Sequence, residues 1–177
     1  MRIVCFKRQP VTFETIIDPK KVERMEIAFC DVESLEGIHR LTHLTEVHIH
    51  YCRSLSDISQ LGLLRRLRQI NLYSLPNVEL EFEVTKLKHL ESLSYTNVAR
   101  IASIHGIESL KKLSYLGLSR VKVLDGDYMP IIKCKSLKRV FWHDAPFKAP
   151  AMNEIRELRP DILVGGNSAR PSKSKKR

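Results

Sequence analysis

The 177-residue sequence lacks the features that would point to a membrane protein or to an enzyme. No apolar run approaches the roughly 20 residues that a membrane-spanning helix needs. The first ten residues do not form the apolar stretch of a secretory signal peptide, so we expect a cytoplasmic protein. There is no Gly-rich phosphate loop and no Gly-x-Ser-x-Gly nucleophile motif. We therefore expect no catalytic activity and no cofactor.

The sequence does contain an apolar block of the form Leu-x-x-Leu-x-Leu that occurs six times. The first residues of the blocks are Val22, Leu44, Leu67, Leu90, Leu113 and Leu137, so the successive steps are 22, 23, 23, 23 and 24 residues. A period held this tightly predicts a solenoid, in which stacked repeats share one core. The alternation inside each block predicts a short strand with one buried face.

Between the blocks, apolar residues recur at every third position. The clearest series is Leu35, Ile38, Leu41 and Leu44. This spacing predicts a tight 3₁₀ turn rather than a long α-helix. Each repeat is then a short strand, a turn and a short helical return, and only stacking buries its apolar face.

The segment 55–64, Leu-Ser-Asp-Ile-Ser-Gln-Leu-Gly-Leu-Leu, resembles the leucine-rich-repeat family, in its short bacterial and Sds22-like subclass. The resemblance covers residues 20–164. It implies an α/β solenoid with a curved parallel sheet on the concave side, short helical or 3₁₀ turns on the convex side, and a binding role. One position departs from the family pattern, because the usual Asn is replaced by Cys30, Cys52, Leu75, Val98, Val121 and Ala145.

The ends of the chain read as caps and a tail. Residues 1–19 are expected to form an N-terminal cap, in which residues 3–6 and 11–17 form a strand pair over the open core. The repeats then run over residues 20–164, with a degenerate C-terminal cap from residue 150 that contains Ile155, Leu158, Ile162 and Val164. Residues 165–177 are expected to be a disordered basic tail, since residues 168–177 carry five of the ten net positive charges and no acid.

Two side-chain pairs deserve weighing as chemical sites. Cys30 and Cys52 occupy equivalent positions about 5 Å apart, which permits a disulfide, but reduced thiols in the core are favoured in a cytoplasmic protein. His48 and His50 project from one strand face and supply two possible zinc ligands. A structural zinc needs four and a catalytic zinc usually three, so histidines in a protein interface are favoured over a metal site.

The alternation also locates a candidate binding surface, because the residues between the buried positions point out across the concave face. The candidate contact residues are Glu26, Glu46, His48, His50, Asn71, Tyr73, Tyr115, Arg139, Phe141 and His143. Tyr73, Tyr115, Arg139 and Phe141 are expected to form one patch that supplies most of the binding energy, since aromatic and Arg side chains anchor protein interfaces.

These observations predict a non-enzymatic protein-binding module that acts through its concave face, as an adaptor or a dedicated inhibitor. A cytoplasmic immunity protein that neutralises a toxin is one form of such an inhibitor. The expected partner is another protein with an acidic patch, and the free protein is expected to be a monomer. A nucleic-acid-associated protein that uses the basic tail is an alternative, disfavoured because the concave positions carry few Lys or Arg residues.

Overall fold

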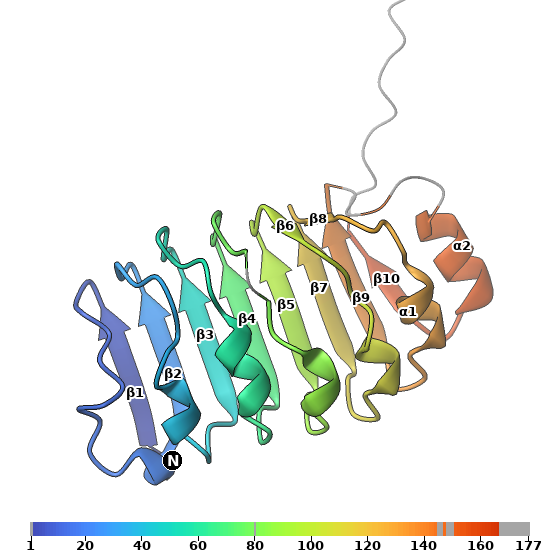
Figure 1. The fold of residues 1–177 in the computed structure, drawn as a ribbon. Coiled ribbons are helices and arrows are strands. Elements are labelled where there is room, and N and C mark those ends of the chain that lie inside the picture. The colour runs from blue at the N-terminus through green and yellow to red at the C-terminus, as the bar shows by residue number, and fades with distance from the viewer. Residues whose placement is uncertain (1, 80, 145–146, 148–150, 167–177) are drawn as a thin grey trace, which may run out of the picture.

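The computed structural model describes residues 2–79, 81–144, 147 and 151–166, and it forms a solenoid around one parallel sheet (Figure 1). The strand order is β1-β2-β3-β4-β5-β7-β9-β10. The strands are β1 (Arg2–Lys7), β2 (Val22–Ala28), β3 (Glu46–His50), β4 (Gln69–Tyr73), β5 (Ser92–Thr96), β7 (Tyr115–Ser119), β9 (Arg139–His143) and β10 (Leu163–Gly165). The six predicted blocks coincide with β2, β3, β4, β5, β7 and β9, so the predicted solenoid with a parallel sheet is confirmed.

The return segments on the other side of the sheet are short helical turns, as the three-residue spacing predicts. The 3₁₀ helices are η1 (Pro19–Lys21), η2 (Ile38–Arg40), η3 (Ser59–Leu63), η4 (Val84–Lys86) and η5 (Ile107–Ser109). Two α-helices, α1 (Met129–Lys133) and α2 (Ala151–Leu158), follow towards the C-terminus. A small parallel pair, β6 (Arg100–Ile101) and β8 (Lys122–Val123), links two neighbouring returns. None of the described helices is long and apolar enough to cross a membrane.

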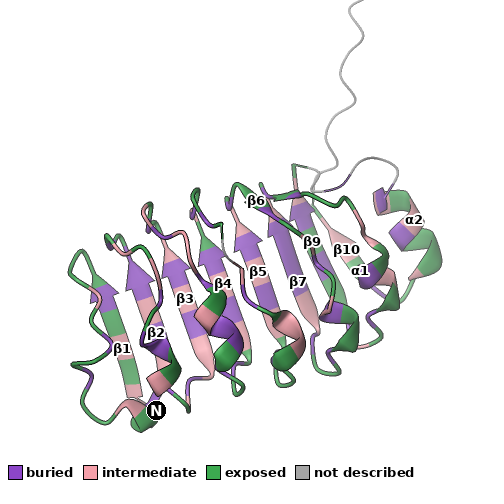
Figure 2. Ribbon diagram, in the orientation of Figure 1, coloured by how far each residue is buried: buried purple, intermediate pink, exposed green. Residues whose placement is uncertain are grey.

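The core lies between the sheet and the helical returns (Figure 2). The Leu-type positions are buried throughout; Leu44, Leu67 and Leu113, for example, have no exposed surface. Among the described residues, no polar or charged residue is buried. The fold is therefore held by one continuous apolar ladder, in which each repeat buries its neighbour.

Backbone hydrogen bonds keep the repeats in register at both ends of the strands. Before the strands, the amide of Arg68 donates to the carbonyl of Thr45 and the amide of Glu91 to that of Arg68, both at 2.8 Å. After the strands, the amide of Tyr51 donates to the carbonyl of Tyr73 at 3.0 Å. Equivalent positions of successive repeats therefore stack directly on one another along each edge.

The N-terminal cap differs from the predicted strand pair. β1 joins the main sheet in parallel beside β2, with Cys5 opposite Glu26. Residues 11–17 form no strand; instead Phe13 and Ile16 are buried against the core, whereas Ile17 is exposed. A single parallel strand satisfies the edge of β2, so a second strand is not needed to close this end.

In the C-terminal cap Ile155 and Ile162 are buried as predicted, whereas Leu158 is 55% exposed, and Arg159 adds polar contacts to this end. The guanidinium of Arg159 donates hydrogen bonds to the carbonyls of Ile132 at 2.9 Å and Cys134 at 3.0 Å, and pairs with Asp161 at 2.8 Å. These bonds tie the last turn to the preceding repeat, where the Cys134 carbonyl also accepts from the amide of Leu137 at 3.2 Å. Gly165 is the last residue of β10, and the rest of the predicted basic tail, apart from Gly166, lies outside the described residues.

The two cysteines that replace the usual Asn act as hydrogen-bond donors in the turns. The thiol of Cys30 lies 3.3 Å from the carbonyl oxygen of Ala28, and that of Cys52 lies 3.5 Å from that of His50. Both are free thiols, as are Cys5 and Cys134. Burial raises the pKa of the Cys52 thiol, which keeps it in the protonated form that can donate.

Candidate functional site

The outward positions of the sheet form a continuous face of eight strands, and we call it the concave face. The register places Glu26 beside His48 and His48 beside Asn71, while Glu46 lies beside Gln69, and His50 beside Tyr73. Further along, Tyr115 lies beside Arg139, Gly117 beside Phe141 and Ser119 beside His143. β1 adds Ile3, Cys5 and Lys7 to the same face, which the sequence interpretation had assigned to a separate cap.

The N-terminal part of this face is charged, and its charges pair across strands. Arg24 lies 3.7 Å from Glu46, and His50 lies 3.4 Å from Glu26. His48 lies 3.8 Å from Glu46, but its Nε2 atom is buried and has no hydrogen-bond partner. Burial and the nearby Arg24 guanidinium lower the pKa of His48 from its ordinary value, so this imidazole favours the neutral form.

A row of three exposed aromatic rings runs along the adjacent strand ends. Phe29 and Tyr51 stack with ring centroids 4.6 Å apart and planes 9° apart, and Tyr51 meets Tyr73 edge-on at 5.1 Å. Arg8 extends the row, because its guanidinium lies 5.4 Å from the Phe29 ring centroid. The rings remain 43%, 41% and 38% exposed. We call Phe29, Tyr51 and Tyr73 the aromatic row.

Two members of the aromatic row have a backbone conformation that such residues rarely adopt. Phe29 has φ 56° and Tyr51 has φ 58°, both in the left-handed region. The same position has positive φ after each of the other strands of the main sheet, at Arg8, Ser74, Asn97, Arg120, Asp144 and Gly166. The left-handed conformation costs an L-residue about 1–2 kcal/mol, and Asn or Gly adopts it most readily. Large aromatic rings are therefore the least expected side chains here, and local backbone geometry does not explain them.

A second cluster lies at the C-terminal part of the concave face. The Arg139 guanidinium lies 5.6 Å from the Tyr115 ring centroid, and Phe141 and Leu163 are both exposed beside it. Gly117 allows Tyr115 to lie flat, since a Cβ atom there would come within 3.1 Å of the Tyr115 hydroxyl. We call Tyr115, Arg139, Phe141 and Leu163 the C-terminal cluster.

The four predicted anchors do not form one patch, contrary to the sequence-based expectation. Tyr73 belongs to the aromatic row, whereas Tyr115, Arg139 and Phe141 belong to the C-terminal cluster. Strand β5, with its small Ser94 side chain, separates them. Tyr73 ends its strand and Tyr115 begins one two strands away, which places their backbones about 15 Å apart. The concave face therefore has two anchor regions with a low polar strip between them.

The structure also contains a pocket on the convex side that the sequence did not reveal. It is lined by Glu81, Tyr95, His105 and neighbouring residues of the returns. Burial raises the pKa of Glu81, whose carboxylate accepts a hydrogen bond from the amide of Ala102. Tyr95 occupies a Leu-type position, and its larger ring is the only sequence signal for this pocket. Among the described residues, no group of three or more His, Cys, Asp or Glu side chains is arranged to hold a metal ion.

Comparison with known proteins finds similarity in structure but not in sequence. No protein-family model and no curated protein matches the sequence. An internalin (inlF) from Listeria monocytogenes superposes with a TM-score of 0.57 at 18% identity, over 91% of this chain and 52% of that one. Internalin C2 (inlC2) from the same organism gives a TM-score of 0.53 at 16% identity, over 93% of this chain and 80% of that one. The chain thus spans about half the length of the first of these structures. The likeness concerns the fold alone, which is that of a leucine-rich-repeat solenoid.

Proposed function

We propose that this chain is a non-enzymatic module that binds another protein through its concave face. The observation that carries the proposal is the pair of anchor regions on a rigid sheet. Exposed aromatic and Arg side chains are the usual hot spots of protein interfaces, and both regions contain them. Side chains held on strands lose little further freedom on binding, which favours affinity.

The aromatic row is the stronger of the two anchor regions. Its backbone strain at Phe29 and Tyr51 yields no packing benefit in the core, because both rings lie on the surface. Strain that persists without a structural benefit is typical of functional positions. Mutual stacking keeps the rings in place before a partner arrives, so little ordering is needed on binding.

The charges at the N-terminal part of the concave face suggest how a partner would be selected. Glu26, Glu46, Arg24 and the two histidines form a mixed network rather than a field of one sign. A partner that approaches this network must match alternating charges, which gives specificity more than affinity. An adaptor and a dedicated inhibitor, including an immunity protein against a toxin, would both use such a surface; the identity of the captured protein distinguishes them.

The test is affinity capture from the source cell with three matched baits. The first is the wild-type chain, and the second carries Tyr73→Ala, Arg139→Ala and Phe141→Ala on the concave face. The third carries Leu63→Ala, Lys86→Ala and Met129→Ala on the exposed convex side. We expect one protein to be held by the wild-type and convex baits and lost from the concave bait. A partner lost only from the convex bait would refute the surface assignment.

A further inference from the structure

Ten exposed lysine and arginine side chains gather along the edge where the strands begin, the lower edge in Figure 1. In five of the six repeats they fill one or more of three positions: the two before the first Leu-type residue and the one after it. The members are Lys20, Lys21, Arg65, Arg66, Arg68, Lys88, Lys111, Lys112, Lys135 and Lys138. We call these ten residues the basic edge.

The backbone places these side chains in one row. Between successive repeats, the residue after each first Leu-type position donates its amide to the carbonyl of the same position in the previous repeat. The steps from Glu23 through Thr45, Arg68, Glu91 and Ser114 to Lys138 measure 2.8, 2.8, 2.8, 2.9 and 3.0 Å. Cations flank this ladder in five of the six repeats, and the repeat of Leu44 has Thr42, His43 and Thr45 instead. From the first repeat to the sixth, five strand spacings give a row about 24 Å long.

Few acids oppose the row. Lys21 pairs with Asp18 at 2.9 Å, and Arg68 lies 3.9 Å from Glu91. Within the described part of the chain, Arg65, Arg66 and Lys111 form no ion pair. Lys112 lies 3.3 Å from Nδ1 of His89, so its ammonium donates to a histidine instead of meeting an acid. Like charges at this density repel one another, and nothing in the core requires them.

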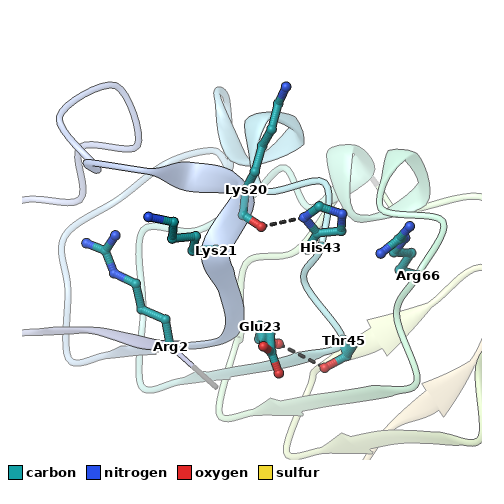
Figure 3. A pocket seen from close by; sticks show the side chains of 7 residues that line it. All are labelled: Arg2, Lys20, Lys21, Glu23, His43, Thr45 and Arg66. Carbon is teal, nitrogen blue, oxygen red and sulfur yellow. Dashed lines mark hydrogen bonds between the residues drawn. The ribbon is translucent and has the colours of Figure 1, made fainter.

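A pocket opens at the N-terminal end of this row (Figure 3). It is lined by Arg2, Lys20, Lys21, Glu23, His43, Thr45 and Arg66. Nδ1 of His43 hydrogen-bonds the carbonyl of Lys20, and the hydroxyl of Thr45 donates to the carbonyl of Glu23 at 3.0 Å. The recess is thus lined by residues of β1, β2, η1 and the turns before β3 and β4, with one acid and four lysine or arginine residues, and the Lys20 side chain extends away from the others (Figure 3). Such a recess suits an anionic oxygen group.

The chemistry of the row favours a phosphate polymer over other anionic partners. Lysine is depleted in protein interfaces, and this row contains seven lysines and no Phe, Tyr or Trp. Single-stranded nucleic acid is usually held by stacking on aromatic rings. These positions offer only the imidazoles of His43 and His89, and both are engaged in hydrogen bonds. A membrane surface is usually bound by a basic face that also carries apolar side chains, and the row positions carry none that is exposed.

We propose that the basic edge binds the phosphate backbone of a nucleic-acid duplex without reading its sequence. A row about 24 Å long spans about seven base pairs at 3.4 Å each. Ion pairing with several phosphates releases counterions, so the affinity should fall steeply with salt. This site is separate from the concave face, so it stands or falls independently of the protein-binding proposal.

The test is fluorescence anisotropy with a labelled 20-base-pair DNA duplex of mixed sequence, titrated with the full chain at 50 to 200 mM KCl. The edge variant carries Arg65→Glu, Arg66→Glu, Lys111→Glu and Lys112→Glu. The control variant carries Arg53→Glu, Arg100→Glu, Lys122→Glu and Lys133→Glu, which are exposed, lie off the basic edge and change the net charge equally. We expect the edge variant to bind at least about 30-fold more weakly at 50 mM KCl, and the control to lose less than about fivefold. The slope of log affinity against log salt should also fall by up to about 3.6 in magnitude for the edge variant.

Three results would overturn the proposal. The first is a wild-type chain that does not bind the duplex at 50 mM KCl. The second is an equal loss in the edge and control variants, because that would reflect net charge rather than a site. The third is preferential binding of the wild-type chain to vesicles with 30 mol% phosphatidylserine over the duplex, which would assign the edge to a membrane surface. Circular dichroism of both variants, whose substituted side chains are all exposed, confirms that they fold.

Discussion

The two edges of the sheet are built by the same repeat and carry opposite kinds of surface. Where the strands begin, the ladder through Thr45 and Arg68 is flanked by exposed cations, of which Lys21 and Arg68 lie close to an acid. Where the strands end, the equivalent ladder passes through residues with positive φ, and two of these, Phe29 and Tyr51, stack as exposed rings. The repeat therefore determines where each side chain lies on the backbone. The residues at the variable positions determine which kind of partner each edge can bind.

The residues that stabilise the fold are different from the residues that form the two surfaces. The apolar ladder holds both edges together and carries no information about function. The cations of one edge and the aromatic rings of the other contribute little to the free energy of folding, because both remain exposed. Changes in the core should abolish both surfaces at once, whereas changes at one edge should leave the other intact.

The largest expected effect comes from breaking the ladder that both edges share. Leu116 lies in the middle of the sheet with no exposed surface. Leu116→Asp buries a carboxylate without a partner and should lower the free energy of unfolding by about 4 kcal/mol or more. Urea denaturation followed by circular dichroism measures this, with Ser119→Asp on the outward face as the control. A soluble variant of unchanged stability would show that the strand register is wrong.

A smaller loss of stability is expected at the C-terminal end, where the Arg159 side chain contacts carbonyls in and just after α1. Arg159→Ala removes the bonds to the carbonyls of Ile132 and Cys134, and of these two only the Cys134 carbonyl keeps a backbone donor among the described residues, the amide of Leu137. We expect the free energy of unfolding to fall by about 2–3 kcal/mol. Arg156→Ala, which truncates an exposed side chain of α2 three residues before Arg159, should change it by less than about 0.5 kcal/mol. Equal effects in thermal melts would mean that Arg159 is not the cap.

The next prediction concerns the backbone difference between the edges. At Tyr51 the positive φ should make Tyr51→Gly more stable than Tyr51→Ala by about 1 kcal/mol, since glycine adopts this conformation without steric cost. At Lys111, where φ is not positive, Lys111→Ala should be at least as stable as Lys111→Gly. Chemical denaturation of the four variants tests whether the order of stability of the Gly and Ala variants is opposite at the two positions. The same order at both positions would contradict the left-handed turn.

The smallest effect lies between the edges, at His48. Its pKa in the folded chain is lowered, chiefly by burial and next by Arg24, so the unfolded chain binds a proton more readily. Stability should therefore be retained above the ordinary histidine pKa of about 6.5 and decrease as the pH falls below it. His48→Gln should show a smaller loss of melting temperature between pH 7.5 and 5.5 than the wild type or His39→Gln. If His48→Gln and the wild type lose the same amount, His48 does not titrate as described.

Much of the fold could be predicted from the sequence because the repeat determines it locally. The alternation at Met25 and Ile27 and the 23-residue spacing fix strand, face and register together. The strand β1 was harder to recognise, because residues 2–7 lack the first Leu-type position of the block. Its pairing with β2 depends on an open sheet edge, which only the folded neighbour provides.

The surfaces were less predictable than the fold. Phe and Tyr rarely adopt a positive φ, so the residue types at Phe29 and Tyr51 did not predict the left-handed turn found there. The sequence contains pairs of cations before Val22, Leu67 and Leu113, but the net charge of the repeats as a whole does not reveal them. Acids such as Glu33, Asp57 and Asp125, placed elsewhere in the repeats, offset them in the total. The separation of Tyr73 from Tyr115 followed from an intervening strand of small residues.

The most direct test of the account is calorimetry of the captured protein partner against three forms of this chain. These are the wild type, the concave variant with Tyr73→Ala, Arg139→Ala and Phe141→Ala, and the basic-edge variant used for duplex binding. We predict that the concave variant loses about 2 kcal/mol or more of binding free energy, while the basic-edge variant binds within about 0.5 kcal/mol of wild type. A partner that binds the concave variant normally and the basic-edge variant weakly would contradict the assignment of the concave face.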